Sequence, residues 1–198
     1  MWADAAMLTL SRLLRNIATF IGLGAIPFAT LAAGTVTRGH IGSEALVLDS
    51  PTFRNGARMP RSTVYDRNGC MGSDVSPQLR WSGVPHTVRS FALTINDPDA
   101  KAPGGWWHWV RFNIPASAHA LRAGDRGTGT DGMNSFRRIG YGGPCPPPGG
   151  GIHHYHVLVY GLDVSRLPAT SRTDGPALTR MVHGHTLAVG NLVGTYSR

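Results

Sequence analysis

Apolar and polar positions alternate in steps of two along much of this chain, which is the period of a β-strand. In one segment Phe91, Leu93 and Ile95 fall on the same face of an extended chain. A second segment is rich in aromatic and β-branched residues, and a third is apolar on both faces, which predicts a strand buried on both sides. These three predicted strands span Ser90–Ile95, Trp107–Ile114 and His154–Leu162.

Weaker patterns predict shorter elements. We expect extended segments at Ala45–Leu48, Thr63–Tyr65 and Ser76–Trp81. One short helix is predicted over Leu178–Gly184, and Thr186–Tyr196 predicts a final strand pair or an extended tail. The stretch Leu121–Arg138 is rich in Gly, Asp and Arg and predicts a long loop.

The pattern as a whole predicts a mainly β fold, an antiparallel two-sheet β-sandwich with a few short helices. The chain has 198 residues, enough for one domain with a sizeable core, and its 26 Gly and 14 Pro indicate many turns. The predicted core residues are Phe91, Leu93, Ile95, Val110, Phe112, Val157, Val159, Leu187 and Val189.

The N-terminal segment has a different pattern. Arg12 and Arg15 precede an apolar run, Ile17–Leu31, which leads into the small residues Ala32 and Ala33. A positive region, a short apolar run and small residues are typical of a secretory signal peptide. The alternative is an uncleaved membrane anchor, although the run is shorter than the ~20 residues that a spanning helix needs.

We therefore predict a signal peptide over residues 1–33, with translation starting at Met1 or Met7, and a single domain over residues 34–198. The predicted location is outside the cytoplasm, periplasmic or secreted, with membrane anchoring as the alternative.

The formal net charge is +8, from 19 Lys and Arg against 11 Asp and Glu. Lys101 is the only lysine, and the arginines are scattered apart from the pair Arg137–Arg138. Because no basic stripe or aromatic-interleaved motif occurs, we expect affinity for anionic membrane surfaces rather than for nucleic acid.

Two cysteines, Cys70 and Cys145, lie in Gly-rich segments of the predicted domain. An oxidising compartment permits a disulfide between them, and two cysteines allow one intramolecular pairing. The alternative is two separate, small apolar side chains.

Two clusters of polar residues stand next to rigid Pro and Gly turns at the ends of the strong strands. The first contains Asp97, Asp99 and His108 with Trp106, and the second is a Gly/Pro-rich stretch that leads into residues 153–156. Stiff walls with a few convergent polar groups and aromatic lining are typical of a small preformed pocket.

The chemistry of these clusters follows from their spacing. Asp97 and Asp99 are two residues apart on an extended segment, so we expect both carboxylates to point the same way, with His108 compensating their repulsion. His153 and Tyr155 share one face of the later strand, where the Tyr155 hydroxyl can donate a hydrogen bond. Each feature alone is also common in purely structural roles.

The chain resembles the phosphatidylethanolamine-binding protein family, in particular its bacterial Raf-kinase-inhibitor-like branch. The resemblance extends from about Leu46 to the C-terminus. It rests on Ser76–Pro77 with Trp81, Asp97–Ala100, His108–Trp109, Tyr141–Pro147, Gly151–Tyr155, Gly184–Ala188 and Gly194–Tyr196.

The resemblance implies a two-sheet β fold with a small cavity that accepts phosphate-like anions and the phosphatidylethanolamine head group. It implies no cofactor and no resident metal. The residues it assigns to the cavity are Asp97, Asp99, Trp106, His108, Gly143, Pro146, His153 and Tyr155. One departure is that Lys101 and Ala102 intervene between the Asp-Pro-Asp-Ala motif and Pro103, which alters the loop at the rim.

The favoured function is a non-enzymatic binding protein for phosphate-bearing small molecules or phospholipid head groups, with His108 and His153 donating to phosphate oxygens. One alternative is a secreted inhibitor or interaction protein that acts on a protease or another exported enzyme. Another is a metal-dependent hydrolase that uses the carboxylates and histidines, although no metal-binding spacing supports it.

Overall fold

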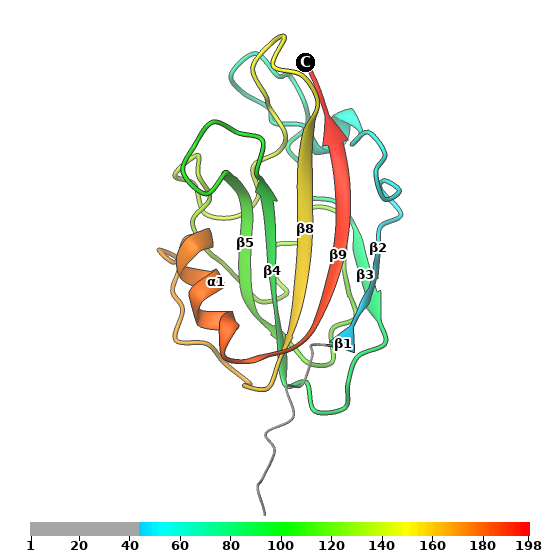
Figure 1. Cartoon of the computed structure of the whole chain (residues 1–198), viewed down its shortest axis with the longest axis vertical. Helices are drawn as coiled ribbons and strands as arrows, with labels where there is room; N and C mark the ends of the chain where they lie inside the picture. The colour runs from blue at the N-terminus through cyan, green and yellow to red at the C-terminus, as the bar shows by residue number, and fades with distance from the viewer. Residues whose placement is uncertain (1–43) are drawn as a thin grey trace, which may run out of the picture. The chain divides into compact units, whose positions relative to one another are not determined.

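The computed structural model describes residues 44–198, which form two sheets and one α-helix (Figure 1). The strands are β1 (Glu44–Ala45), β2 (Val47–Asp49), β3 (Leu79–Ser82), β4 (Ser90–Asp97), β5 (Trp106–Pro115), β6 (Ala120–Leu121), β7 (Thr130–Asp131), β8 (His153–Leu162) and β9 (Thr186–Tyr196). The helices are the 3₁₀ turn η1 (Arg61–Thr63) and α1 (Gly175–His183). The expected signal peptide and the domain boundary at residue 34 lie outside the described residues.

The larger sheet has the strand order β1-β9-β8-β4-β5-β7, and the smaller has the order β2-β3-β6. All pairings are antiparallel except that of β1 with β9. In Figure 1, β5, β4, β8 and β9 lie side by side, and α1 lies beside β5. The predicted two-sheet, mainly β fold is confirmed.

The main core fills the space between the two sheets, where Trp81, Phe91 and Trp109 are almost wholly buried. A second, smaller core lies beneath α1 and contains Val110 and Phe112 of β5. Burying these aromatic and branched side chains supplies most of the favourable free energy of folding.

The predicted core is wrong on β9. Leu187 and Val189 are only partly buried, and the inward face carries Leu192 together with the small residues Ala188, Gly190 and Gly194. Strand β2 and the loop that follows it pack closely there. A Cβ on Gly190 would lie 2.8 Å from the Leu48 Cβ, and a Cβ on Gly194 would lie 2.6 Å from Met59 Cγ. Glycine therefore occupies positions 190 and 194 because a larger side chain would collide there.

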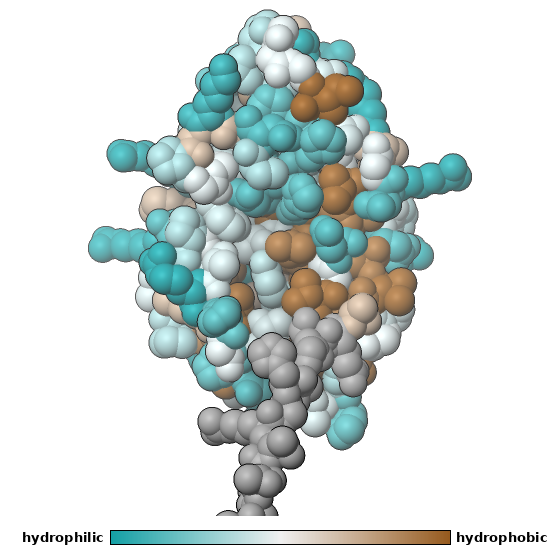
Figure 2. Space-filling view, in the orientation of Figure 1, coloured by the Kyte–Doolittle hydropathy of each residue, from teal (hydrophilic) through white to brown (hydrophobic). Residues whose placement is uncertain are grey.

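Strand β8 is not buried on both faces as predicted. His153, Tyr155, Val157 and Val159 face the core. The alternate residues His154, His156, Leu158 and Tyr160 are partly or fully exposed, and only the last one, Leu162, is buried. The helix lies mainly over β4 and β5 and reaches β8 only at its last residues, where Leu162 shares a buried cluster with Leu178 and Val182. Within residues 44–198, no helix covers the rest of this face of β8. Figure 2 shows apolar patches over this β8–β9 half of the surface.

Local chemistry explains the remaining differences. The expected strand at Thr63–Tyr65 is replaced by η1, where the Thr63 hydroxyl and amide both donate to Pro60 O. Helix α1 begins earlier than predicted because the Asp174 carboxylate accepts from Ala177 N and Pro176 occupies the first turn. The final segment is a single 11-residue strand.

Between residues 44 and 198, no helix is both long and apolar enough to cross a bilayer.

Candidate functional site

The site begins where β4 ends, at Asp97. Its Oδ1 accepts hydrogen bonds from the backbone amides of Asp99 and Ala100, at 3.0 and 3.2 Å. An aspartate that bonds the amides two and three residues later forms a tight turn. Gly105 lies against this turn, because a Cβ there would be 2.5 Å from Asp97 O. The turn therefore fixes the direction of the Asp97 carboxylate.

The second Asp97 oxygen holds His153, the first residue of β8. Oδ2 lies 2.7 Å from His153 Nδ1, and both side chains are almost wholly buried. The sequence assigned the role of charge partner to His108, which is wrong because β8 brings His153 to the end of β4. With Nδ1 engaged, His153 Nε2 is the ring nitrogen that remains for a ligand.

Asp99 does not point the same way as Asp97. Its Oδ2 accepts from His154 N at 2.7 Å and lies 2.8 Å from His154 Nδ1 on the exposed side of β8. The hydrogen bond from His154 lowers the pKa of the Asp99 carboxyl. The expected parallel pair of repelling carboxylates is therefore wrong, because the turn after Asp97 breaks the extended chain on which it depended.

His108 is fully buried in β5. Its Nδ1 lies 2.7 Å from Gly142 O, and a carbonyl can only accept, so Nδ1 carries the hydrogen. Burial, partly offset by the backbone contact with Gly142, lowers the pKa of His108 from 6.5 to about 4. The ring is therefore neutral at pH 7, and its Nε2, which has no partner among residues 44–198, is an acceptor.

Tyr155 lies next to His108, with ring centroids 5.0 Å apart. Its buried hydroxyl also has no hydrogen-bond partner in the described part of the chain. Burial and the nearby Asp97 carboxylate raise the pKa of Tyr155, so the hydroxyl keeps its hydrogen and can donate it. A buried donor without a partner costs free energy that a ligand can recover.

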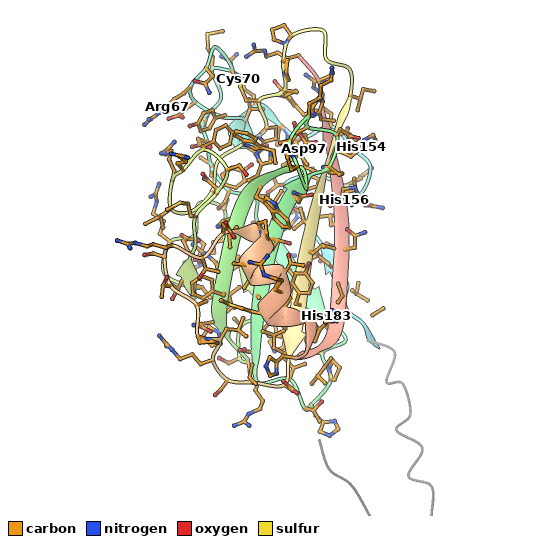
Figure 3. The ribbon with its side chains drawn as sticks, turned by 60° about the vertical axis from the view of Figure 1, so that its left-hand side comes forward. Arg67, Cys70, Asp97, His154, His156 and His183 are labelled. Carbon is orange, nitrogen blue, oxygen red and sulfur yellow. A yellow bond between two sulfur atoms is a disulfide. The ribbon has the colours of Figure 1, made fainter. Side chains whose placement is uncertain are left out.

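These side chains line one cavity of about 480 Å³ at the end of the larger sheet. Figure 3 shows Asp97, His154 and Cys70 at this end of the fold and His183 at the other. Of the sequence-predicted residues, the cavity brings together Asp97, Asp99, Trp106, His108, Pro146, His153 and Tyr155.

Gly143 does not line the cavity. A Cβ at this position would overlap the carbonyl oxygen of Thr63, and its amide donates to Asp74 Oδ1 at 2.7 Å. The structure thus gives Gly143 a packing role beneath the cavity wall.

The sequence missed several wall residues. Phe136 packs edge-on against Trp106 and His108. It is the only aromatic residue in the polar segment Leu121–Arg138, a signal that could have identified it. Asn68, Pro147 and Gly150 also line the cavity. Lys101 lines it too, in the lengthened loop that the sequence already placed at the rim.

Cys70 and Cys145 form a disulfide with a Cα–Cα distance of 5.8 Å. Cys145 lines the cavity, so the bridge joins one wall to the loop that carries Asn68. Among the residues that the structure describes, no group of three or more His, Cys, Asp or Glu side chains is arranged to hold a metal ion.

Comparison with known proteins relates most of this chain to one protein family. Residues 49–197 match the family model "Phosphatidylethanolamine-binding protein". The UPF0098 protein YbcL of Escherichia coli is 38% identical over 160 residues, covering 77% of this chain and 87% of YbcL. A UPF0098 protein of Aquifex aeolicus is 36% identical, covering 79% of this chain and 91% of that protein.

Solved structures show the same fold. The crystal structure of E. coli YbcL superposes with a TM-score of 0.74 at 34% identity, covering 77% of this chain and 98% of YbcL. A Chlamydia trachomatis homologue superposes with a TM-score of 0.70 at 32% identity, covering 79% and 99% of the two chains. This chain therefore belongs to the phosphatidylethanolamine-binding protein family.

Proposed function

We propose that this protein binds phosphate-bearing small molecules or phospholipid head groups in the cavity between Asp97, His108 and Tyr155, and that it acts by binding rather than by catalysis. The observation that carries the proposal is that three residues lining the cavity each have a buried polar atom without a partner among the described residues. These atoms are His108 Nε2, Tyr155 Oη and Trp106 Nε1. A phosphate group offers both acceptor oxygens and, when protonated, a donor.

Different polar groups of the cavity can contact different parts of the ligand. Tyr155 donates to a phosphate oxygen, and the His153 ring, oriented by Asp97, donates from Nε2 when it is protonated. Because His108 is neutral in the empty cavity, it accepts a hydrogen from the ligand or takes up a proton on binding. Asp99 at the rim supplies a negative charge for an ethanolamine ammonium group.

Calorimetric titration with inorganic phosphate and then with phosphoethanolamine tests the proposal. We expect saturable binding and a higher unfolding temperature at millimolar ligand, because a ligand that binds only the folded state stabilises it. His153→Ala should abolish both effects. His156→Ala is the matched control, since this histidine lies in β8 but does not line the cavity. Absence of binding by the unsubstituted protein would refute the anion-binding function.

The surroundings of the cavity favour a lipid source for the head group. Met71 and Ile152 are 68% and 64% exposed, on the same two loops that carry Asn68 and Gly150 of the cavity wall. Exposed apolar side chains on a protein of net charge +8 suit an anionic bilayer surface. Sedimentation with vesicles that contain phosphatidylethanolamine and an anionic lipid should capture the protein. Met71→Ser with Ile152→Ser should weaken capture without altering binding of free phosphoethanolamine.

We further propose that the domain works outside the cytoplasm. The Cys70–Cys145 disulfide supports this location, because such bonds persist in oxidising compartments. Cell fractionation would test it, and recovery only in the cytoplasmic fraction would overturn it.

A further inference from the structure

The disulfide connects the two loops that form one side of the cavity. Asn68 is two residues from Cys70, and Pro146 and Pro147 directly follow Cys145. Below the bridge the loops are also tied by Tyr65 N to Pro144 O at 3.1 Å and by Gly143 N to Asp74 Oδ1. These two hydrogen bonds involve residues up to Pro144. Beyond Pro144, the position of the cavity wall depends on the disulfide and on the residues next to it.

Arg198 is the neighbour that contacts both loops. Its Nη1 lies 3.0 Å from Asn68 O, and its backbone oxygen accepts from Gly149 N at 3.0 Å. The same Nη1 lies 2.8 Å from Cys70 Sγ but 3.7 Å from Cys145 Sγ. A guanidinium group next to sulfur stabilises a thiolate, and here it favours Cys70.

Both cysteines are half-buried, so the bridge can be reached from solvent. Cys145 borders the cavity, and Cys70 borders a separate surface hollow together with Arg58, Arg61 and Met71. A structural disulfide deep in a core has neither this access nor a cation at one sulfur.

We propose that the Cys70–Cys145 disulfide is a thiol-exchange site through which a dithiol reductant loosens the cavity wall and weakens ligand binding. A thiolate of the dithiol attacks Cys145 Sγ, the S–S bond breaks, and the electron pair leaves on Cys70 Sγ beside Arg198. The second thiol then attacks the mixed disulfide and releases Cys145. The dithiol becomes a cyclic disulfide, and its two protons pass to the cysteines or to solvent.

The binding part of this inference rests on the proposed phosphate-binding function, so the first experiment compares the two redox states. Phosphate titrations of the oxidised protein and of protein reduced with dithiothreitol should differ by about tenfold or more in Kd, and reoxidation should restore the affinity. Circular dichroism of both states checks that the reduced protein remains folded. Equal affinities would overturn the inference, whereas absence of binding in the oxidised state would refute the proposed function instead.

The exchange chemistry has a readout that does not depend on any ligand. Arg198→Ala should slow reduction by dithiothreitol by roughly threefold or more, because a leaving thiol of lower pKa departs faster. Arg198→Lys should keep most of the rate. Arg58→Ala is the matched control, as Arg58 borders the neighbouring hollow and bonds Ser197. Trapping with a monothiol should place the first mixed disulfide on Cys145. Equal rates, or trapping on Cys70, would overturn the role of Arg198.

Discussion

His108 shows at the scale of one residue how burial sets chemistry. A histidine in water has a pKa near 6.5, whereas burial lowers the pKa of His108 to about 4. The neutral ring offers one acceptor nitrogen to the cavity, because Nδ1 is committed to Gly142 O. The residue is thus a poor anion receptor until a ligand supplies a proton or raises its pKa.

This lowered pKa predicts a dependence of stability on pH. Between pH 6.5 and 4 the unfolded chain binds a proton at His108 that the folded chain does not, so the free energy of unfolding falls as the pH falls. The neutral His108 contributes about 3 kcal/mol to the free energy of unfolding above pH 6.5, and this contribution is lost by pH 4. Urea unfolding across this window should show a flatter curve for His108→Asn than for His156→Asn. Parallel curves would contradict the assignment.

The same histidine predicts the orientation of phosphoethanolamine. Above pH 7 the phosphate of phosphoethanolamine is a dianion and has no hydrogen to donate. Binding of this phosphate next to His108 Nε2 therefore requires that the complex take up a proton. We expect the affinity to fall by up to about tenfold per pH unit above pH 7, with heat that depends on the buffer. His108→Asn should remove this slope. A flat profile in the unsubstituted protein would instead place the ammonium group, which carries its own hydrogens, beside His108.

At the scale of elements, the buried Arg111 fastens β5 to the loop that follows it. The side chain is 1% exposed and lies 2.7 Å from both Asp125 and Asp131, and its guanidinium also contacts the Trp109 ring. Asp131 belongs to the short strand β7 and accepts from Trp109 Nε1 as well. The ion pairs of Arg111 therefore hold the segment that contains Asp125 and Asp131 in one conformation, although the sequence predicted only a loop there.

Removal of this arginine should be costly. Arg111→Met leaves two partly buried carboxylates without their cation, and we expect a loss of about 3 kcal/mol in the free energy of unfolding. Arg67→Met removes an exposed pair with Asp66 and should change stability by less than about 0.5 kcal/mol. Urea denaturation of both variants makes the comparison, and equal losses would contradict the argument.

The elements also show what the sequence can predict. The strong strands, the fold class and the grouping of His153 with Tyr155 follow from the period of two. The inward face of β9 does not, because Gly190 is required by the close approach of β2 and Gly194 by the close approach of Phe53 and Met59 in the following loop. The separation of Asp99 from Asp97 depends on a tight turn, which the residues Asp-Pro-Asp favour but which a period of two ignores. The position of Phe136 depends on the path of a loop, which no local pattern encodes.

At the scale of the whole molecule, the disulfide closes a loop between residues 75 apart in the sequence. Restricting the unfolded chain over that length stabilises the folded state by up to ~4 kcal/mol in the chain-entropy treatment. Cys70→Ser with Cys145→Ser should therefore lower the unfolding temperature clearly. Calorimetric scans of the variant and of the oxidised protein would measure the difference, and unchanged stability would show that other contacts already order these loops.

The turn after β4 has a consequence for which residues position 97 can accept. One carboxylate oxygen accepts hydrogen bonds from backbone amides, and the other accepts from the His153 imidazole. The first contact requires a short side chain, and the second requires an oxygen acceptor at the second position. Asparagine keeps one oxygen for the backbone amides but presents an NH₂ group to His153, and glutamate is too long to close the turn. Aspartate is thus the one residue that satisfies both, and a saturation library at this position should return it alone among variants that retain the ligand.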